Sequence, residues 1–310
     1  MKSNRVIVAK SALSTGDVSA GLLNPEQSRT FMRQIFDATP LGALIRHEMR
    51  RSRTGELDKI GIASRILRKK VEGTDDNYRA KPTFGKVEYA CTPVRLPWEI
   101  TEDTLRENIE GQGLEATVTD LMTRQIGVDQ EDLYMNGDTE TAETDVDYDF
   151  LKINDGFIKQ IEAGGHVEDR TSISSGAMSI DVYYDALAEM PNKYNNGTLR
   201  WLMSPRRKQE WERYLINQLI TAGGGITDNL INNPASIPAV EVPSLPDSKI
   251  ILTNPKNLIV VNSYSIIIRK TVEGKEAIMQ DKRFYVVHFD FDAVIEELDA
   301  TVIIKGLAAL

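Results

Sequence analysis

Two β-like segments around a polar tip, followed by a long helix pattern, constrain this chain more than any other feature. The first segment spans Ile60–Arg68, the tip Glu72–Arg79 and the return Lys86–Cys91. A two-stranded ribbon is only marginally stable in water, because it has little core of its own. The ribbon is therefore expected to lie against something else, which favours a self-assembling protein over a compact enzyme.

The segment after the ribbon predicts a long helix. Apolar residues recur at helical spacing, at Leu114, Val118, Leu121, Met122 and Ile126. Asn136-Gly137 follows them, and this pair is typical of a left-handed stop at the carboxyl end of a helix.

Length and composition exclude several classes of protein. The chain has 310 residues, enough for one large or two ordinary domains, and 41% of them are apolar. It contains no run of about 18 apolar residues, so no transmembrane helix is expected. Met1–Val6 lacks the apolar region of a signal peptide. The single cysteine, Cys91, excludes an intramolecular disulfide, fits a reducing cytosol and is interpreted as a small buried residue.

Charge is distributed unevenly along the chain. The net charge of −9 argues against a general nucleic-acid binder. Arg46–Lys70 holds nine basic and three acidic residues, whereas Gly127–Phe150 holds nine acidic residues and no basic one. The two blocks are either solvated surface or complementary surfaces of neighbouring subunits, and the residues alone leave both readings open. The candidate contact residues are Arg50, Arg51, Arg53, Arg65, Arg68, Lys69, Lys70, Asp129, Glu131 and Asp132.

The rest of the chain predicts mixed helices and strands, and hence an α+β protein. Residues 1–23 are interpreted as an arm, a helix is expected from Asn24-Pro25, and Leu41–Met49 indicates a short amphipathic turn. Val94–Leu96, bracketed by prolines, is expected to be a sheet edge or a turn. Further helices are expected over 150–161 and 179–190 and from Ser204-Pro205 onward, with strands over 199–203, 240–243, 249–252, 257–261, 265–269, 285–291 and 300–305.

Catalytic and metal-binding patterns are weak. His47, His166 and His288 are each interpreted as packed or solvated, and the chain has no HExxH, GxSxG or Walker motif. Asp145, Asp147 and Asp149 imitate the start of a calcium loop, but phenylalanine stands where that loop needs glycine and glycine where it needs glutamate. No cofactor, metal or enzymatic activity is therefore expected.

Four segments, in this order, resemble the major capsid proteins of tailed bacteriophages, which have the Hong Kong 97-type fold. Arg95–Thr101 (RLPWEIT) is similar to the exit from the family's hairpin, and Glu131–Asp138 (EDLYMNGD) to the end of its spine helix. Trp201–Pro205 (WLMSP) is similar to a strand-to-helix step of the axial domain, and Ile237–Pro246 to a proline-containing segment of the family. The resemblance covers most of the chain.

The resemblance implies an N-terminal arm, a β-hairpin called the E-loop, a spine helix, a peripheral domain and an axial domain. The expected boundaries are 1–55 for the arm, 56–98 for the E-loop, 99–148 and 260–298 for the peripheral domain with the spine helix, and 149–259 and 299–310 for the axial domain. The implied function is that of a virion shell protein assembled in the host bacterial cytoplasm. The favoured reading of the basic block then becomes contact with a neighbouring subunit rather than with DNA.

Partners are also implied by the resemblance. They are other copies of the chain in hexamers and pentamers, a portal, packaged double-stranded DNA held by non-specific contact, and a decoration protein, with no membrane. Because only residues 1–55 precede the E-loop and Met1 begins the chain, scaffolding is expected from a separate protein. Lys69, Lys70 and Lys81 lie in the hairpin, but no asparagine or glutamate can be paired with them, so self-crosslinking is not expected.

Two other classes remain open at this stage. An encapsulin-like compartment would share the fold and enclose a cargo enzyme instead of DNA. A cytosolic α+β enzyme would instead require a monomer or small oligomer with a defined pocket.

Overall fold

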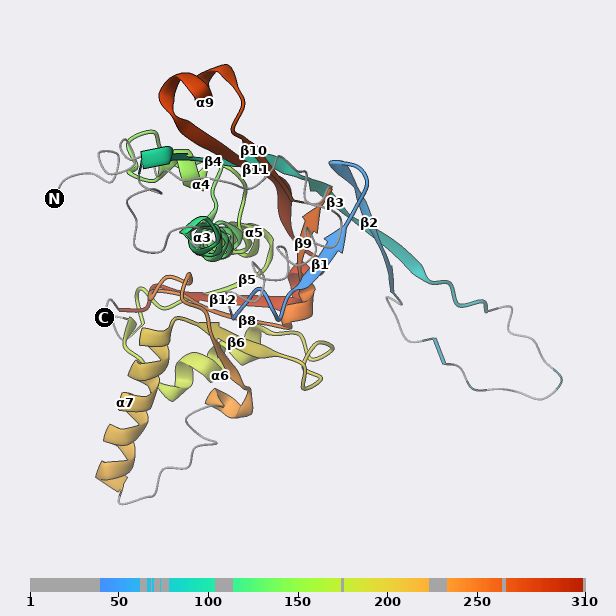
Figure 1. Cartoon of the computed structure of the whole chain (residues 1–310). Helices are drawn as coiled ribbons and strands as arrows, with labels where there is room; N and C mark the ends of the chain where they lie inside the picture. The colour runs from blue at the N-terminus through green and yellow to red at the C-terminus, as the bar shows by residue number, and fades with distance from the viewer. Residues whose placement is uncertain are drawn as a thin grey trace.

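Two five-stranded sheets and one separate two-stranded ribbon organise the chain (Figure 1). The computed structural model describes residues 40–61, 66–67, 69, 73, 78–103, 114–173, 176–222, 233–263 and 266–308. The predicted helix at Asn24, most of the hairpin tip and residues 223–232 lie outside the described residues.

The first sheet is held together by one long strand, β11 (Lys282–Ile295). Lys282–Phe291 of β11 pairs antiparallel with β4, and the same half pairs with β10 on its other side. Asp292–Ile295 pairs instead with β9, which in turn pairs with β1 in parallel. The other strands of this sheet are β1 (Arg46–Met49), β4 (Thr92–Thr101), β9 (Leu258–Asn262) and β10 (Ile267–Thr271).

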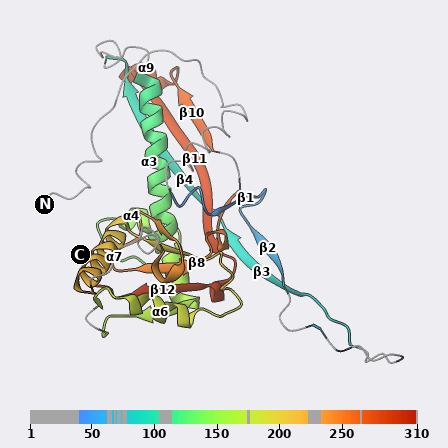
Figure 2. The same cartoon turned by 90° about the horizontal axis from the view of Figure 1, so that it is seen from below.

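A 23-residue helix, α3 (Leu114–Asn136), lies along this sheet (Figure 2). Its buried residues Val118, Ile126 and Leu133 face the inward side chains of β4 and β11. Trp98 of β4 stacks on Tyr285 of β11 at 5.2 Å between ring centroids, beneath this helix. The long helix predicted from apolar spacing is confirmed.

The second sheet has the order β5-β12-β8-β6-β7 and is covered on both faces. Leu202, Ile251 and Ile303 face α5 (Phe157–Gly164) and join the core that lies under α3. Their neighbours along the strands face α6 (Ile180–Glu189) and α7 (Pro205–Ala222), as strand alternation requires. The strands are β5 (His166–Asp169), β6 (Arg200–Met203), β7 (Ala239–Glu241), β8 (Ile250–Thr253) and β12 (Thr301–Lys305).

The ribbon consists of β2 (Thr54–Gly61) and β3 (Thr83–Ala90), paired antiparallel from Thr54 with Ala90 to Gly61 with Thr83. It leaves the body beside β9 and extends away from both sheets (Figure 1). Short helices complete the described fold. They are α4 (Tyr148–Leu151), α9 (Lys275–Gln280) between β10 and β11, and the 3-10 turns Pro234–Ser236, Pro255–Asn257 and Leu298–Ala300.

Two predicted elements were wrong. Arg46–Met49 is not a helical turn but the strand β1, because the edge of β9 supplies backbone partners to these four residues. The helix expected over 150–161 is broken into α4 and α5. It breaks where a side chain on Gly156 would lie 2.6 Å from the carbonyl oxygen of Met135.

Gly137 also differs from its prediction as a left-handed stop. Among the described glycines, those with positive φ are Gly73, Gly176, Gly197 and Gly306, so Gly137 is outside that group. A Cβ on Gly137 would instead collide with the carbonyl oxygen of Asn154. Glycine is therefore required there for the close approach of two backbones.

The proline-bracketed segment Val94–Leu96 lies at a sheet edge, which is one of the two structures expected for it; the other was a turn. It lies within β4, which pairs with β11 over its whole length. The ribbon itself ends at Ala90. The E-loop boundary expected at Trp98 therefore falls inside a strand of the first sheet.

Candidate subunit-contact surfaces

Part of the basic segment Arg46–Lys70 forms ion pairs and hydrogen bonds within the same chain. Arg46 of β1 donates from Nη1 to Glu296 at 2.8 Å. Lys59 of the ribbon donates from Nζ to the carbonyl oxygen of Glu296 at 2.9 Å and pairs with Glu297 at 3.0 Å. The glutamates that follow β11 therefore hold both β1 and the root of the ribbon against the body.

Arg50, Arg51 and Arg53 lie in the turn between β1 and β2, and all three are exposed. Arg50 approaches Glu48 at 3.7 Å, and Arg53 approaches the fully buried Asp290 at 3.7 Å. This turn, named here the basic turn, is the accessible part of the segment that precedes the ribbon. Lys69 is exposed on the hairpin, whereas Arg65, Arg68 and Lys70 lie outside the described residues.

One of the three acidic candidates for subunit contact, Glu131 of α3, is buried. Its carboxylate accepts hydrogen bonds from the backbone N–H of Leu41 and from Ser244 Oγ, both at 3.2 Å. The carboxylate therefore joins three segments within one chain, and it is not available to a neighbouring copy.

The other acidic candidates on α3, Asp129 and Asp132, are partly exposed. Asp129 accepts a hydrogen bond from Gln125 at 2.7 Å, and Asp132 accepts one from Asn136 at 2.6 Å. Burial raises the pKa of Asp129 above its usual value. Both acids keep a surface that a neighbouring copy could reach.

Among the described residues, the two charge blocks use different partners. The ion pairs of the basic segment include Glu48, Asp290, Glu296 and Glu297. The acidic segment pairs with nearby lysines: Lys159 contacts Asp138 at 2.6 Å, and Lys152 contacts Asp149 at 3.6 Å. Contact between the blocks remains a prediction about neighbouring copies.

The ribbon has two faces of different character. Leu57, Val87 and Tyr89 point to the body and pack with Cys91 and β9. The opposite face, named here the outer face, carries four exposed cross-strand pairs: Thr54 with Ala90, Glu56 with Glu88, Asp58 with Lys86, and Ile60 with Phe84.

The last of these pairs is apolar and lies in water. Ile60 is 71% exposed and Phe84 is 69% exposed. The sequence pattern identified the ribbon but not this face, because the strands were expected several residues later than β2 and β3. The alternation of Glu56, Asp58 and Ile60 with Leu57 and Lys59 is the signal that could have found it.

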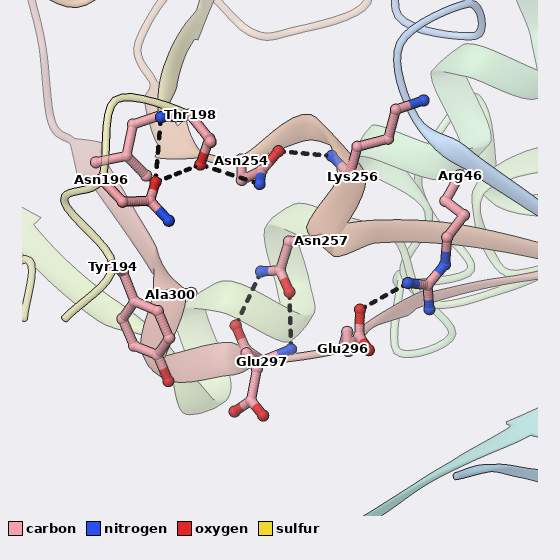
Figure 3. A pocket seen from close by; sticks show the side chains of 11 residues that line it. Arg46, Tyr194, Asn196, Thr198, Asn254, Lys256, Asn257, Glu296, Glu297 and Ala300 are labelled. Atoms are coloured by element: carbon pink, nitrogen blue, oxygen red, sulfur yellow. Dashed lines mark hydrogen bonds and ion pairs between the residues drawn. The ribbon is translucent and has the colours of Figure 1, made fainter. Parts of the chain in front are cut away.

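A cleft of about 200 Å³ is lined by Arg46 of β1, by the loop that precedes β6, and by the turns after β8, after β11 and before β12 (Figure 3). Its polar side chains mostly bond to one another. Asn254 donates to Thr198 at 3.1 Å, and Asn257 donates to the carbonyl oxygen of Glu297 at 2.9 Å. The cleft is therefore a joint between segments rather than a site prepared for a substrate.

Burial shifts the pKa of two side chains, Cys91 and His47, in opposite directions. Burial raises the pKa of Cys91 to about 12, so its thiol stays protonated, and it donates to the carbonyl oxygen of Val261 at 3.5 Å. Burial also lowers the pKa of His47, whose Nε2 lies 2.7 Å from the carbonyl oxygen of Gly42.

The described ranges contain neither a metal-binding cluster nor a membrane-spanning helix. Within them, no group of three or more acidic, histidine or cysteine side chains could hold a metal ion. None of the helices described there is long and apolar enough to cross a membrane.

Known proteins similar to this chain are shell proteins. No family model matches it. YqbE of Bacillus subtilis (strain 168), assigned as a prophage capsid protein, is 28% identical, and the match covers 97% of each chain. The satellite phage P4 procapsid with its size determination (Sid) protein matches with a TM-score of 0.66, at 14% identity over 98% of this chain and 96% of that chain. The holo-SrpI encapsulin complex of Synechococcus elongatus PCC 7942 matches with a TM-score of 0.52, at 12% identity over 98% of this chain and 94% of that chain.

The expected parts of the fold are present in the expected order: ribbon, long helix and two interleaved sheets. Both the curated relative and the phage structure are capsid proteins matched over nearly the whole chain. The Hong Kong 97-type capsid fold that the resemblance implied is therefore confirmed, and the chain is similar over nearly its whole length to a prophage capsid protein.

Proposed function

We propose that this chain is the major capsid protein of a tailed bacteriophage, that it builds an icosahedral head from hexamers and pentamers, and that the ribbon and the basic turn join neighbouring copies. The observation that carries the proposal is the ribbon, because its whole outer face is exposed in the single chain. A ribbon of this kind gains buried area only when another molecule covers it. Head-to-tail contacts of one arm on the next copy close into rings, as hexamers and pentamers require.

The role proposed for the chain is structural. Its basic turn, at Arg50, Arg51 and Arg53, would meet acids on the surface of a neighbour, including the partly exposed Asp129 and Asp132. We further propose a separate scaffolding protein, a portal, a decoration protein and non-specific contact with the packaged DNA. Assembly would take place in the cytoplasm of the host bacterium.

Changing Arg50, Arg51 and Arg53 to serine tests the basic turn. Exposed ion pairs are screened by salt, so assembly of the natural chain is expected to weaken as salt rises, and the triple variant to assemble poorly even at low salt. The control changes three exposed arginines outside the segment, Arg124, Arg206 and Arg213, to serine. Equal assembly of the triple variant and the natural chain would disprove this role.

Electron microscopy distinguishes a phage head from an encapsulin-like compartment when particles are made from the chain alone and together with the other phage proteins. DNA-filled heads carrying a portal are expected, whereas closed shells that enclose an enzyme would support the encapsulin-like alternative favoured by the SrpI similarity. Size-exclusion chromatography with light scattering gives an independent check. A stable monomer with catalytic turnover would contradict the structural role.

A further inference from the structure

The chain contains two Asn-Gly pairs, Asn136-Gly137 and Asn196-Gly197. An asparagine that precedes glycine is chemically labile, because glycine has no Cβ to keep its backbone nitrogen away from the asparagine side chain. Attack of that nitrogen on the side-chain amide carbon closes a cyclic imide and expels ammonia. Water then opens the imide to aspartate or isoaspartate. The local fold decides which of the two pairs can react.

The pair Asn136-Gly137 is held against this reaction at the end of α3. The Nδ2 atom of Asn136 donates to Asp132 and to the carbonyl oxygen of Ser244, both at 2.6 Å. The N–H of Gly137 donates to the carbonyl oxygen of Leu133 at 3.0 Å. Both reacting groups are therefore bound to other partners, and the helix fixes the backbone between them.

The pair Asn196-Gly197 lies open in the loop that precedes β6 and lines the cleft. Asn196, Gly197 and Thr198 are all exposed. Gly197 has a φ of +83°, and no atom lies within 4 Å of the place that a Cβ would take. Within the described part of the chain, the N–H of Gly197 donates to no acceptor. Its nitrogen can therefore approach the Asn196 side chain without breaking a hydrogen bond.

The amide oxygen of Asn196 is held by two donors from one residue (Figure 3). It accepts hydrogen bonds from the backbone N–H of Thr198 at 3.1 Å and from Thr198 Oγ1 at 2.6 Å. This oxygen gains negative charge when a nitrogen adds to the amide carbon, and donors already aimed at such an oxygen stabilise the transition state. Asn254 donates to Thr198 Oγ1 at 3.1 Å, which strengthens that hydroxyl as a donor.

We propose that Asn196-Gly197 is a site of spontaneous imide formation and deamidation, and that Thr198 accelerates the reaction by binding the amide oxygen. The N–H of Gly197 gives its proton to water or hydroxide, its nitrogen bonds to Cγ of Asn196, and the side-chain nitrogen leaves as ammonia. Opening of the ring consumes one water molecule, so the balance needs no oxidant or reductant. The inference goes beyond the proposed function and does not depend on it.

The product changes the loop in one direction only. Isoaspartate adds a methylene to the backbone between positions 196 and 197 and takes the side-chain oxygen away from Thr198. Thr198 is the residue through which this loop holds Asn254, in the turn between β8 and β9. The new carboxylate also adds negative charge to a cleft that Glu296 and Glu297 already line. Deamidation therefore loosens the contact between the loop and this turn.

Peptide mass spectrometry of the full chain, sampled over time at mildly alkaline pH, tests the site. The reaction is followed in buffer and in concentrated denaturant. In the folded chain Asn196 is expected to deamidate at least as fast as in the unfolded chain. Asn136 is expected to deamidate at least about tenfold more slowly when folded, because its hydrogen bonds must break first. Slower deamidation of Asn196 in the folded chain than in the unfolded one would overturn the proposal.

Variants at position 198 test the role of the hydroxyl. Thr198→Val removes that donor and keeps the backbone N–H, so deamidation of the folded chain is expected to slow roughly three- to tenfold. Thr198→Ser keeps the hydroxyl and is expected to restore the rate. Asn196→Gln would need a larger ring and is expected to give no product at this position. Circular dichroism verifies that the variants fold, and a rate that Thr198→Val leaves unchanged or raises would disprove the acceleration by Thr198.

Discussion

At the residue scale, two buried charges fix the places where distant segments meet. The first is Arg207, which is fully buried near the start of α7. Its Nε donates to the carbonyl oxygen of Asp247 at 2.7 Å, and its Nη2 to that of Ala308 at 2.8 Å. It also pairs with Glu210 one turn later. One guanidinium thus binds the helix, the segment before β8 and the segment after β12.

Arg207→Ala is expected to lower the free energy of unfolding by about 3 kcal/mol, because it leaves buried carbonyls and Glu210 without their donor. Arg206→Ala is the matched control. Arg206 is 75% exposed and lies 3.6 Å from Asp247, so its loss should cost less than about 0.5 kcal/mol. Denaturant unfolding of the unassembled protein measures both. Equal losses of unfolding free energy for Arg207→Ala and Arg206→Ala would show that the buried hydrogen bonds of Arg207 stabilise the fold no more than an exposed ion pair does.

The second buried charge is Asp292, at the root of the ribbon. It accepts from the backbone N–H of Ala90 at 2.7 Å and from Asn154 at 3.1 Å. Burial still raises the pKa of Asp292 above its usual value, because desolvation outweighs these hydrogen bonds. The folded state therefore binds this proton more tightly than the unfolded chain.

Stability from that proton is present at low pH and is lost as pH rises through the folded-state pKa. The free energy of unfolding of the natural chain, minus that of Asp292→Asn, is therefore expected to fall from about pH 4 towards neutrality. Chemical unfolding at several pH values and constant ionic strength gives this difference. The altered hydrogen bonds add a constant offset, so a difference that stays flat or rises with pH contradicts the assignment.

At the element scale, the spacing of apolar residues predicted the long helices. Elements that depend on backbone contacts with distant segments were missed. The helical spacing of apolar residues located α3 and α6 but not every buried position, since Val118 and Ile126 are buried whereas Leu121 and Tyr184 are mostly exposed. β1 was missed because its strand character comes from pairing with β9, and no local pattern encodes a partner so distant in the chain. The buried role of Glu131 was missed for the same reason, since its partners come from two other segments.

The junction of α3 with α4 shows how a backbone contact limits an element. Gly137 follows the helix directly, and its N–H donates to the carbonyl oxygen of Leu133 at 3.0 Å. The segment before α5 crosses it so closely that an added Cβ would collide with the carbonyl oxygen of Asn154. The spine helix and α5 can therefore pack together only while position 137 has no side chain.

Gly137→Ala is expected to destabilise the fold by about 2 kcal/mol or more, because two backbones must separate to admit the methyl group. Gly61→Ala in the ribbon is the matched control, since an added Cβ there meets no atom within 4 Å. Thermal and denaturant unfolding of the unassembled variants measure both changes. A loss at position 61 that equals the loss at position 137 would contradict the close-approach explanation.

At the scale of the whole molecule, the core and the ribbon have separate tasks. The two sheets, α3 and α5 share one continuous apolar core, and α6 and α7 enclose a second one. The ribbon adds only a small cluster at its root, around Leu57 and Tyr89. Stability of the single chain should therefore depend on the sheets, and assembly on the outer face of the ribbon.

Changing Ile60 and Phe84 to threonine tests this division. Both side chains are mostly exposed, and threonine suits a strand, so only their cross-strand contact is lost and the cost in unfolding free energy is expected to stay below about 1 kcal/mol. Light scattering should nevertheless find far fewer shells than the natural chain forms, because the contact between copies loses its apolar part.

The matched control changes two exposed apolar residues on another part of the chain, Val146 and Tyr184, to threonine. It is expected to assemble as the natural chain does, because exposure of an apolar side chain does not by itself make a contact between copies. Shells of normal yield from the Ile60 and Phe84 variant would show that the outer face of the ribbon is dispensable. A large loss of stability in that variant would show instead that the ribbon belongs to the core of the single chain, and the separation of tasks would be wrong.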